Sequence, residues 1–242
     1  MTTLPPTIFH ITHWKAGSQW VRKILEACVP ERIVPPQVYE VQFLKESILE
    51  GRVYPTVYVT QEQFYSVQLP QFWKKFIIIR DLRDTLISVY FSIRFSHQAI
   101  ADEIVEWRRK LELLDEENGL IYLLDEWLPR CAVIQSSWLG DQDGMLKYED
   151  LLHDDIGIFE NVLIDRCQLP VSRENFRRVV NSNRFESLTA GRQRGVEDVR
   201  SHERKGISGD WKNHFTDRLK EQFKGKYGKL LIDTGYEMSM NW

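Results

Sequence analysis

The chain has no long apolar segment. Its most apolar uninterrupted run is residues 76–79, far shorter than the roughly 20 residues that a membrane-spanning helix needs. The amino terminus lacks the basic region that begins a secretory leader, and His10, His13 and Lys15 interrupt the apolar stretch that follows it. We therefore expect a cytoplasmic protein that does not insert into membranes.

Cysteine is also scarce. Cys28, Cys131 and Cys167 are far apart, odd in number and without the spacing of metal ligands. Such a set is typical of thiols in a reducing compartment, and it argues against a disulfide framework. We expect no disulfide and no metal requirement.

Positive charge is not in excess. The 242 residues include 32 Lys and Arg against 35 Asp and Glu, for a net charge of -3. Sequence-independent binding of nucleic acid needs a broad basic surface, so we expect no nucleic-acid partner and only local basic sites. Because 43% of the residues are hydrophobic and no repeat or linker divides the chain, residues 1–242 are predicted to form a single domain.

Strand patterns are followed by helix patterns along the chain. Residues 8–12 and 75–80 have the short apolar composition of buried strands, and residues 17–28 and 81–95 carry apolar side chains at helical spacing. Further strands are predicted around residues 57–59 and 144–147, a short helix from about residue 149, and long helices over residues 101–118 and 120–138. This alternation predicts an α/β fold in which helices flank both faces of a mostly parallel central sheet.

Residues 12–20 are the first segment that suggests chemistry. They lie where the first predicted strand becomes a helix, a place where unpaired backbone N–H groups favour a bound phosphate. Lys15 adds a mobile positive charge. In the P-loop of nucleotide triphosphatases the lysine follows the second glycine, whereas Lys15 precedes Gly17. This order argues against a metal-dependent triphosphate site.

Residues 79–88 form a second strand-to-helix junction. Arg80 stands at the end of the strand and Ser88 two turns into the helix, and a guanidinium with a hydroxyl suits a phosphate. The competing interpretation is that Arg80 pairs with Asp84. We expect Asp81 and Asp84 to act as charges at the helix amino terminus rather than as metal ligands.

A third cationic segment lies in residues 204–216, where Arg204 and Lys205 precede Gly206. Adjacent cations in a glycine-containing loop suit a compact dianion, which backbone N–H groups and side chains hold together. Residues 189–209, which overlap this segment, lack any period, which predicts a long loop; loops of that length are usually functional lids or disordered segments.

Together these segments resemble the cytosolic-type sulfotransferases, which use 3′-phosphoadenosine 5′-phosphosulfate (PAPS). Lys15, Gly17 and Trp20 keep the pattern of the family's Pro-Lys-Ser-Gly-Thr-Thr-Trp loop, whereas Trp14, Ala16, Ser18 and Gln19 depart from it. Residues 204–216 resemble the family's Arg-Lys-Gly loop. The resemblance implies a P-loop-like phosphosulfate loop, PAPS as donor and the desulfated nucleotide PAP as product.

The resemblance also implies roles for individual residues. Lys15 is expected at the bridging oxygen of the leaving phosphate, and Tyr148 and Phe185 are expected near the adenine. The implied nucleotide-binding residues are Lys15, Ala16, Gly17, Ser18, Gln19, Trp20, Arg80, Ser88, Tyr148, Phe185, Arg204, Lys205 and Gly206.

The family's catalytic histidine is missing. Its Thr-His-Leu-Pro segment corresponds to residues 58–61, which contain no histidine. An alcohol acceptor still has to lose its proton to a base within hydrogen-bond reach. We expect His97 to be this base. His13, Glu46, Glu50 and Glu62 remain alternatives.

The resemblance predicts in-line transfer of a sulfuryl group from PAPS to a hydroxyl or amine of a small or medium acceptor. A P-loop-type nucleotide kinase and a non-catalytic PAP-binding module remain open as alternatives. The oligomeric state also remains open, because Asp217 replaces the valine of the family's dimer segment. Candidates for an aromatic-lined acceptor pocket are Trp14, Tyr54, Tyr58, Tyr65, Trp73 and Phe91.

Overall fold

The centre of the molecule is a parallel four-stranded sheet. The computed structural model of the protein describes residues 4–35, 42–98 and 102–242. Within these residues the strand order is β2-β1-β3-β4, and each neighbouring pair is parallel. The strands are β1 (Thr7–Thr12), β2 (Val53–Val57), β3 (Trp73–Ile79) and β4 (Met145–Lys147).

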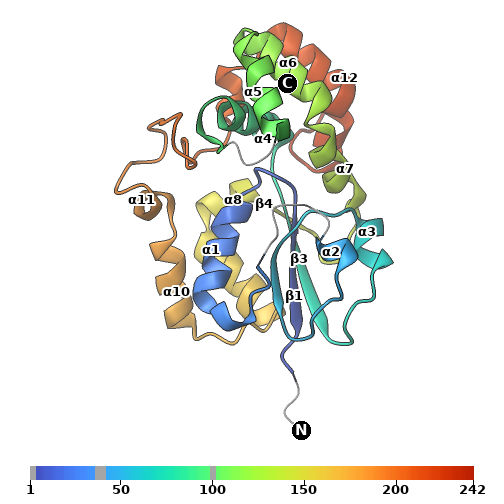
Figure 1. Cartoon of the computed structure of the whole chain (residues 1–242), viewed down its shortest axis with the longest axis vertical. Coiled ribbons are helices and arrows are strands. Elements are labelled where there is room, and N and C mark those ends of the chain that lie inside the picture. The colour runs from blue at the N-terminus through green and yellow to red at the C-terminus, as the bar shows by residue number, and fades with distance from the viewer. Residues whose placement is uncertain (1–3, 36–41, 99–101) are drawn as a thin grey trace.

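Both faces of the sheet are buried. Side chains of a strand point alternately to opposite faces, so Ile8 packs in one apolar cluster while Phe9 and Ile11 pack in another. The first cluster is covered by α1 (Ser18–Cys28), α8 (Tyr148–His153), α9 (Asp155–Phe159), η3 (Glu160–Arg166) and α10 (Arg173–Ser182). The second is covered by α2 (Gln42–Lys45), α3 (Gln61–Ser66) and α7 (Pro129–Ser137). This arrangement, visible in Figure 1, confirms the predicted α/β fold.

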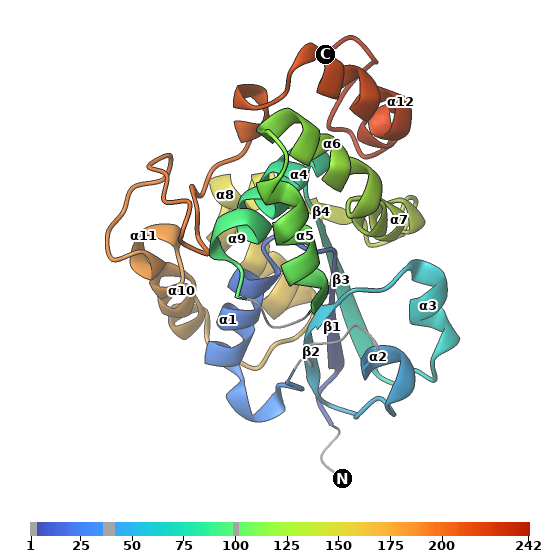
Figure 2. The ribbon, with the colours of Figure 1, turned by 45° about the horizontal axis from the view of Figure 1, so that its top comes forward.

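A third layer of helices lies beyond the carboxyl ends of the strands. It consists of α4 (Leu82–Phe91), η2 (Ser92–Ser96), α5 (Asp102–Glu112), α6 (Glu116–Glu126) and α12 (Asp217–Asp233), which pack around their own apolar cluster. Figure 2 shows this group above the sheet. In open parallel sheets, ligands bind beside the carboxyl ends of the strands, and this layer therefore encloses the place where a site is expected.

Three predicted elements were wrong in their extent. The predicted long helices over residues 101–118 and 120–138 are three helices, α5, α6 and α7. Asp115 caps α6 by accepting the N–H of Asn118 at 2.8 Å, and Pro129 begins α7. Residue 101 lies outside the described residues. The strand expected around residues 57–59 is β2, which ends at Val57 because Thr60 already caps α3.

The other predicted elements lie where the sequence placed them, with small shifts. β3 begins earlier than predicted, at Trp73, and the helix predicted at residues 81–95 continues from α4 into η2. Residues 189–209 contain neither helix nor strand, as expected. Elements not predicted are η1 (Pro30–Arg32), α2, α3, α9, η3, α10, α11 (Phe185–Leu188), η4 (Asp210–Asn213) and α12.

Cys28, Cys131 and Cys167 all lie in the described ranges and form no disulfide. Across residues 4–35, 42–98 and 102–242, no helix is both long enough and apolar enough to cross a bilayer. The same residues contain no group of three or more His, Cys, Asp or Glu side chains placed to hold a metal ion.

Candidate active site

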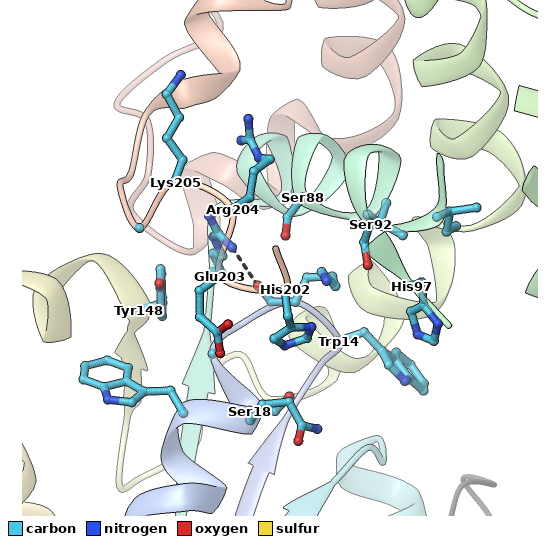
Figure 3. Close-up of a pocket in the computed structure, with 18 of the residues that line it drawn as sticks. Trp14, Ser18, Ser88, Ser92, His97, Tyr148, His202, Glu203, Arg204 and Lys205 are labelled. Atoms are coloured by element: carbon cyan, nitrogen blue, oxygen red, sulfur yellow. Dashed lines mark hydrogen bonds between the residues drawn. The ribbon is translucent and has the colours of Figure 1, made fainter. Parts of the chain in front are cut away.

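A cavity of about 870 Å³ opens at the carboxyl-end edge of the sheet. His97 and every residue predicted to bind the nucleotide line it except Ala16, whose side chain is completely buried. In Figure 3, Tyr148 lies at one end, Trp14 and His97 lie at the other, and the hydroxyls of Ser88 and Ser92 point into the space between. We call these the Tyr148 end and the Trp14 end.

The loop between β1 and α1 is shaped for close approach of a ligand. Lys15 and Gly17 both have a positive φ, 66° and 82°. A Cβ atom at Gly17 would lie 2.8 Å from the ring of Tyr148, so only glycine fits there without displacing the ring. The loop leads directly into α1, whose first turn presents unpaired N–H groups and the positive end of the helix dipole.

Lys15 lies in a crowded cationic environment. Burial lowers the pKa of its ammonium group to about 8, and the positive charges of Arg80 and Arg204 act in the same direction. A bound anion would favour the charged form of Lys15 that these surroundings disfavour. The cavity is therefore electrostatically prepared for a highly charged anionic ligand.

Arg80 lies at the end of β3 and beneath the phosphate-type loop. Its Nη1 donates to the carbonyl oxygen of Lys15 at 2.9 Å, and its guanidinium carbon lies 4.7 Å from the centroid of the Tyr148 ring. Its buried Nε has no hydrogen-bond partner among the described residues. A guanidinium with an unused donor beside a cavity is suited to a bound oxyanion.

Asp84 does not hydrogen-bond to Arg80, contrary to the competing interpretation of the sequence. Its carboxylate accepts the backbone N–H groups of Gly209 and Trp211 at 2.6 and 2.9 Å. Burial raises the pKa of Asp84. Its structural role is thus to hold the end of the 189–209 loop, which we call the cationic loop, against α4.

Arg204 and Lys205 of the cationic loop both pair with the buried carboxylate of Asp210, Lys205 at 2.6 Å. Burial alone raises the pKa of Asp210, but hydrogen bonds from His214, Lys205 and neighbouring donors outweigh it and hold that pKa well below its usual range. Asp210 therefore stays ionised and fixes the two cations at the cavity wall.

Gly206 completes the cationic loop at the Tyr148 end. Its φ is +66°, and a Cβ atom there would lie 2.5 Å from Cδ2 of Phe185. Trp20 also lines this end, and its indole Nε1 is buried without a partner within the described residues. Tyr148, Phe185 and Trp20 together provide aromatic surfaces suited to a flat base.

The Trp14 end has a different composition. The Trp14 ring stacks on Tyr58 with centroids 4.4 Å apart, and Trp107 and Trp127 line the same end. Of the predicted pocket aromatics, Tyr54 and Trp73 instead pack beside β1 in the core. Tyr65 is half exposed and contacts Trp73 and Trp138 outside the cavity. Phe91 lies under the guanidinium of Arg204, at 4.4 Å. Trp107 and Trp127 were missed, because nothing local in the sequence separates them from core tryptophans.

His13 is a structural residue rather than an available base. Its side chain is completely buried, its Nδ1 donates to the carbonyl oxygen of Trp14 at 2.9 Å, and its Nε2 accepts the N–H of Arg80 at 3.2 Å. Burial lowers the pKa of His13 to about 4. Both ring nitrogens are occupied, and the ring holds the two loops of the cavity together.

The other candidates separate clearly by position. His97 lines the cavity, with Nδ1 donating to the carbonyl oxygen of Gln98 at 2.8 Å, which leaves Nε2 for a ligand. Glu46, Glu50 and Glu62 are not among the described residues that line the cavity. His202 lines it as well. No sequence pattern singled out His202, although its place two residues before Arg204 was a usable signal.

A family model described as the sulfotransferase domain matches residues 5–235. Sulfotransferase 2A1 of Homo sapiens is 24% identical over 187 residues, which cover 68% of this chain and 59% of that protein. The flavonol sulfotransferase-like protein of Flaveria bidentis is 25% identical over 234 residues, which cover 91% of this chain and 73% of that protein. The chain thus spans less than two thirds of the length of the human relative.

Two solved structures are similar over most of the chain. The mouse sulfotransferase SULT7A1 in complex with PAP has a TM-score of 0.65 at 16% identity and covers 93% of this chain and 84% of its own. Retinol dehydratase in complex with retinol and PAP has a TM-score of 0.56 at 16% identity, with 96% and 82% covered. At these identities the likeness establishes the fold.

Proposed function

The protein belongs to the sulfotransferase domain family, and on this premise we propose that it transfers a sulfuryl group from PAPS to a hydroxyl or amine of a small or medium acceptor. The observation that carries the proposal is the meeting of Lys15, Arg80 and Arg204 at one cavity. These cations come from three distant parts of a chain whose net charge is -3. A nucleotide phosphorylated at two positions is a ligand that such a cavity fits.

The residues at the Tyr148 end fit the nucleotide part of PAPS. Arg80, Ser88, Arg204 and Lys205 would hold the 3′-phosphate, and the unused Nε of Arg80 supplies a donor for it. The N–H groups at the start of α1 would hold the 5′-phosphosulfate. Ala16 can contribute only through its backbone, because its side chain is buried.

The adenine would lie among the rings of Tyr148, Phe185 and Trp20. Gly17 and Gly206 let the two loops approach two of these rings, at places where a Cβ atom would collide with them. The unpartnered indole N–H of Trp20 is a donor aimed at this part of the cavity.

The proposed mechanism divides the chemistry among three groups. Bound PAPS supplies the activated sulfuryl group. The Lys15 ammonium group neutralises the bridging oxygen, which takes the electron pair of the breaking S–O bond. His97, through Nε2, takes the proton of the acceptor hydroxyl as its oxygen forms the new S–O bond. Trp14, Tyr58, Trp107 and Trp127 position the acceptor and exclude water from the Trp14 end.

The alternatives are less well supported. Neither the family match nor the position of Lys15 before Gly17 supports a nucleotide kinase. A non-catalytic PAP-binding module would use the same Tyr148 end, so turnover is the observation that separates it from an enzyme.

The test compares wild-type protein with Lys15→Ala. We expect wild-type protein to release PAP from PAPS with at least one member of a panel of phenols, alcohols and amines. Lys15→Ala should lose about 100-fold in turnover, the usual effect of removing one charge-stabilising donor. Its affinity for PAP, measured by calorimetry, should change only a few-fold because the other cations remain.

The exposed Lys45 of α2 provides the matched control, and Lys45→Ala should keep the wild-type rate. Full activity of Lys15→Ala would refute the role of Lys15. Tight binding of PAP without turnover across the panel would favour the binding module, and magnesium-dependent binding of ATP would favour the kinase.

A further inference from the structure

His202 is an imidazole of the cavity that the proposed mechanism has not used. It lies on the cationic loop, two residues before Arg204, and its ring lines the cavity. In Figure 3 it lies in the middle of the view, between Glu203 on the side of Tyr148 and the Trp14 and His97 side chains at the other end. Its position is therefore the junction between the two ends.

The charged groups around His202 support this placement. The ring of His202 interacts electrostatically with Lys15, Glu203, Lys23 and His97. His202 is thus close both to the lysine expected at the bridging oxygen and to the histidine expected at the acceptor. Among the described residues, none forms a hydrogen bond with its ring nitrogens.

The backbone on the carboxyl side of His202 is held in place. The neighbouring Glu203 pairs with Lys23 of α1 at 3.1 Å, and Arg204 pairs with Asp210. Arg192 donates to the carbonyl oxygens of both Glu203 and Arg204. A side chain without a partner on a well-anchored backbone is placed to meet a ligand.

In the nucleotide-free protein, the surroundings of His202 favour its neutral form. Its partial burial in the cavity lowers its pKa, and the nearby ammonium group of Lys15 adds to the effect. A neutral imidazole carries one N–H donor without adding a fourth positive charge to the site. Neutral histidine donors of this kind polarise reacting oxygens in other enzymes.

We propose that His202 donates a hydrogen bond to a non-bridging oxygen of the sulfuryl group as it moves from the nucleotide to the acceptor. The inference rests on the proposed function and adds a catalytic residue to it. In the step, the acceptor oxygen forms a bond to sulfur, the bond from sulfur to the phosphate oxygen breaks, and the acceptor proton goes to His97. His202 keeps its own proton throughout.

This role explains why the imidazole comes from the cationic loop. Arg204 and Lys205 of the same loop line the Tyr148 end. Binding of the nucleotide by these cations would fix His202 over the sulfuryl group at the same time, so the donor is in position only when its substrate is present.

The test uses His202→Ala and His202→Gln in the full chain. With PAPS and the best phenol of the panel, His202→Ala should lower kcat about 100-fold, the usual effect of removing one such donor. The affinity for PAP, which has no sulfuryl group, should stay within a few-fold of wild type. His202→Gln keeps an N–H donor at a similar reach and should recover part of kcat.

His153 of α8 is exposed and does not line the cavity, so His153→Asn is the matched control and should behave as wild type. The pH profile separates the two imidazoles. His97→Ala should lose the fall in rate that protonation of a base produces at low pH, whereas His202→Gln should keep it.

Three results would overturn the assignment. If His202→Ala has the same kcat as His153→Asn, His202 has no role in catalysis. If His202→Ala loses PAP affinity and kcat equally, His202 is a nucleotide contact. If the rate of His202→Gln no longer falls at low pH, His202 is the base. If wild-type protein binds PAP but turns over no acceptor, the proposed function fails first, and the inference fails with it.

Discussion

At the scale of single residues, identical side chains take different roles because of what surrounds them. His13 has both nitrogens occupied by backbone groups, His97 has one occupied, and His202 has none occupied by a described residue. Only the last two line the cavity. Availability of a ring nitrogen to a ligand, rather than residue type, selects the candidates for catalysis.

The surroundings of Lys15 also determine its protonation, which predicts how the activity depends on pH. Its pKa is lowered to about 8 in the nucleotide-free protein, so its ammonium group is present below this pH and is lost above it. We expect kcat/KM for PAPS, which reports the free enzyme, to fall about tenfold per pH unit above pH 8.

The control is Lys15→Arg. A guanidinium remains protonated across the accessible pH range. The kcat/KM of this variant should therefore not fall above pH 8, even if its value at lower pH is below that of wild type. An alkaline fall at the same pH in Lys15→Arg would assign the titration to another group.

At the scale of elements, two loops are held against aromatic rings through glycines. Gly17 fits against Tyr148, and Gly206 fits against Phe185. Asp84 of α4 then anchors the far end of the cationic loop through two backbone N–H groups. Loop conformation, ring position and cation position are therefore coupled, and a change in one displaces the others.

We predict that Gly206→Ala weakens PAP binding about tenfold or more. The added Cβ atom would meet Phe185 at 2.5 Å and would also require alanine at a φ of +66°. Strain of about 1–3 kcal/mol is expected for such a position, and tenfold in affinity corresponds to about 1.4 kcal/mol. Calorimetric titration with PAP measures the effect.

Gly191→Ala separates the collision from the backbone strain. Gly191 lies in the same loop with a φ of +91°, and its added Cβ atom would meet nothing within 4 Å. PAP affinity should therefore remain close to wild type in Gly191→Ala. Equal losses in both variants would show that strain in the loop, and not the contact with Phe185, sets the affinity.

At the scale of the whole molecule, Arg83 joins the start of α4 to the carboxyl-terminal segment. Its guanidinium pairs with Asp81 at 2.7 Å and with Glu237 at 2.5 Å. It also lies 4.0 and 4.5 Å from the ring centroids of Trp211 and Trp242, which contact each other edge to face. The side chain is only 3% exposed. Residues far apart in sequence are thus fixed around one buried cation.

We expect Arg83→Ala to destabilise the protein strongly. The substitution leaves the Asp81 carboxylate without its buried partner and opens a gap beside two tryptophans. Removal of one member of a buried ion pair costs about 3–5 kcal/mol, which lowers the melting temperature of a domain of this size by roughly 10 °C. Thermal unfolding followed by circular dichroism measures it.

Arg109→Ala is the matched surface control, because Arg109 is exposed on α5. It should change the melting temperature very little, since surface substitutions have small effects. A melting temperature of Arg83→Ala within a degree of the control would mean that the carboxyl-terminal segment does not depend on Arg83.

The sequence by itself determined that helices cover both faces of a mostly parallel sheet, and it located α1, α4, α8 and the Tyr148 end of the cavity. β1 with α1 and β3 with α4 are each contiguous, and the signals for a buried strand, a phosphate-type loop and a helix lie within a few residues of one another. Lys15, Arg80 and Arg204 were recognisable because the spacing around each is local. The extents of α5, α6 and α7 were less predictable, because a single Asp cap and a single proline decide where one helix ends and another begins.

Only the tertiary structure decided the Trp14 end. One cavity is lined by Trp14, Tyr58, Trp107, Trp127 and His202. No short segment contains these residues, and nothing local in the sequence distinguishes them from ordinary core or loop residues. Their meeting depends on how α4 to α7 and the cationic loop pack beyond the sheet. Long-range packing also set the partners of Asp84 and Arg83. Which charged groups pair depends on their burial and on the distance between groups that are remote in sequence, and no local pattern encodes either.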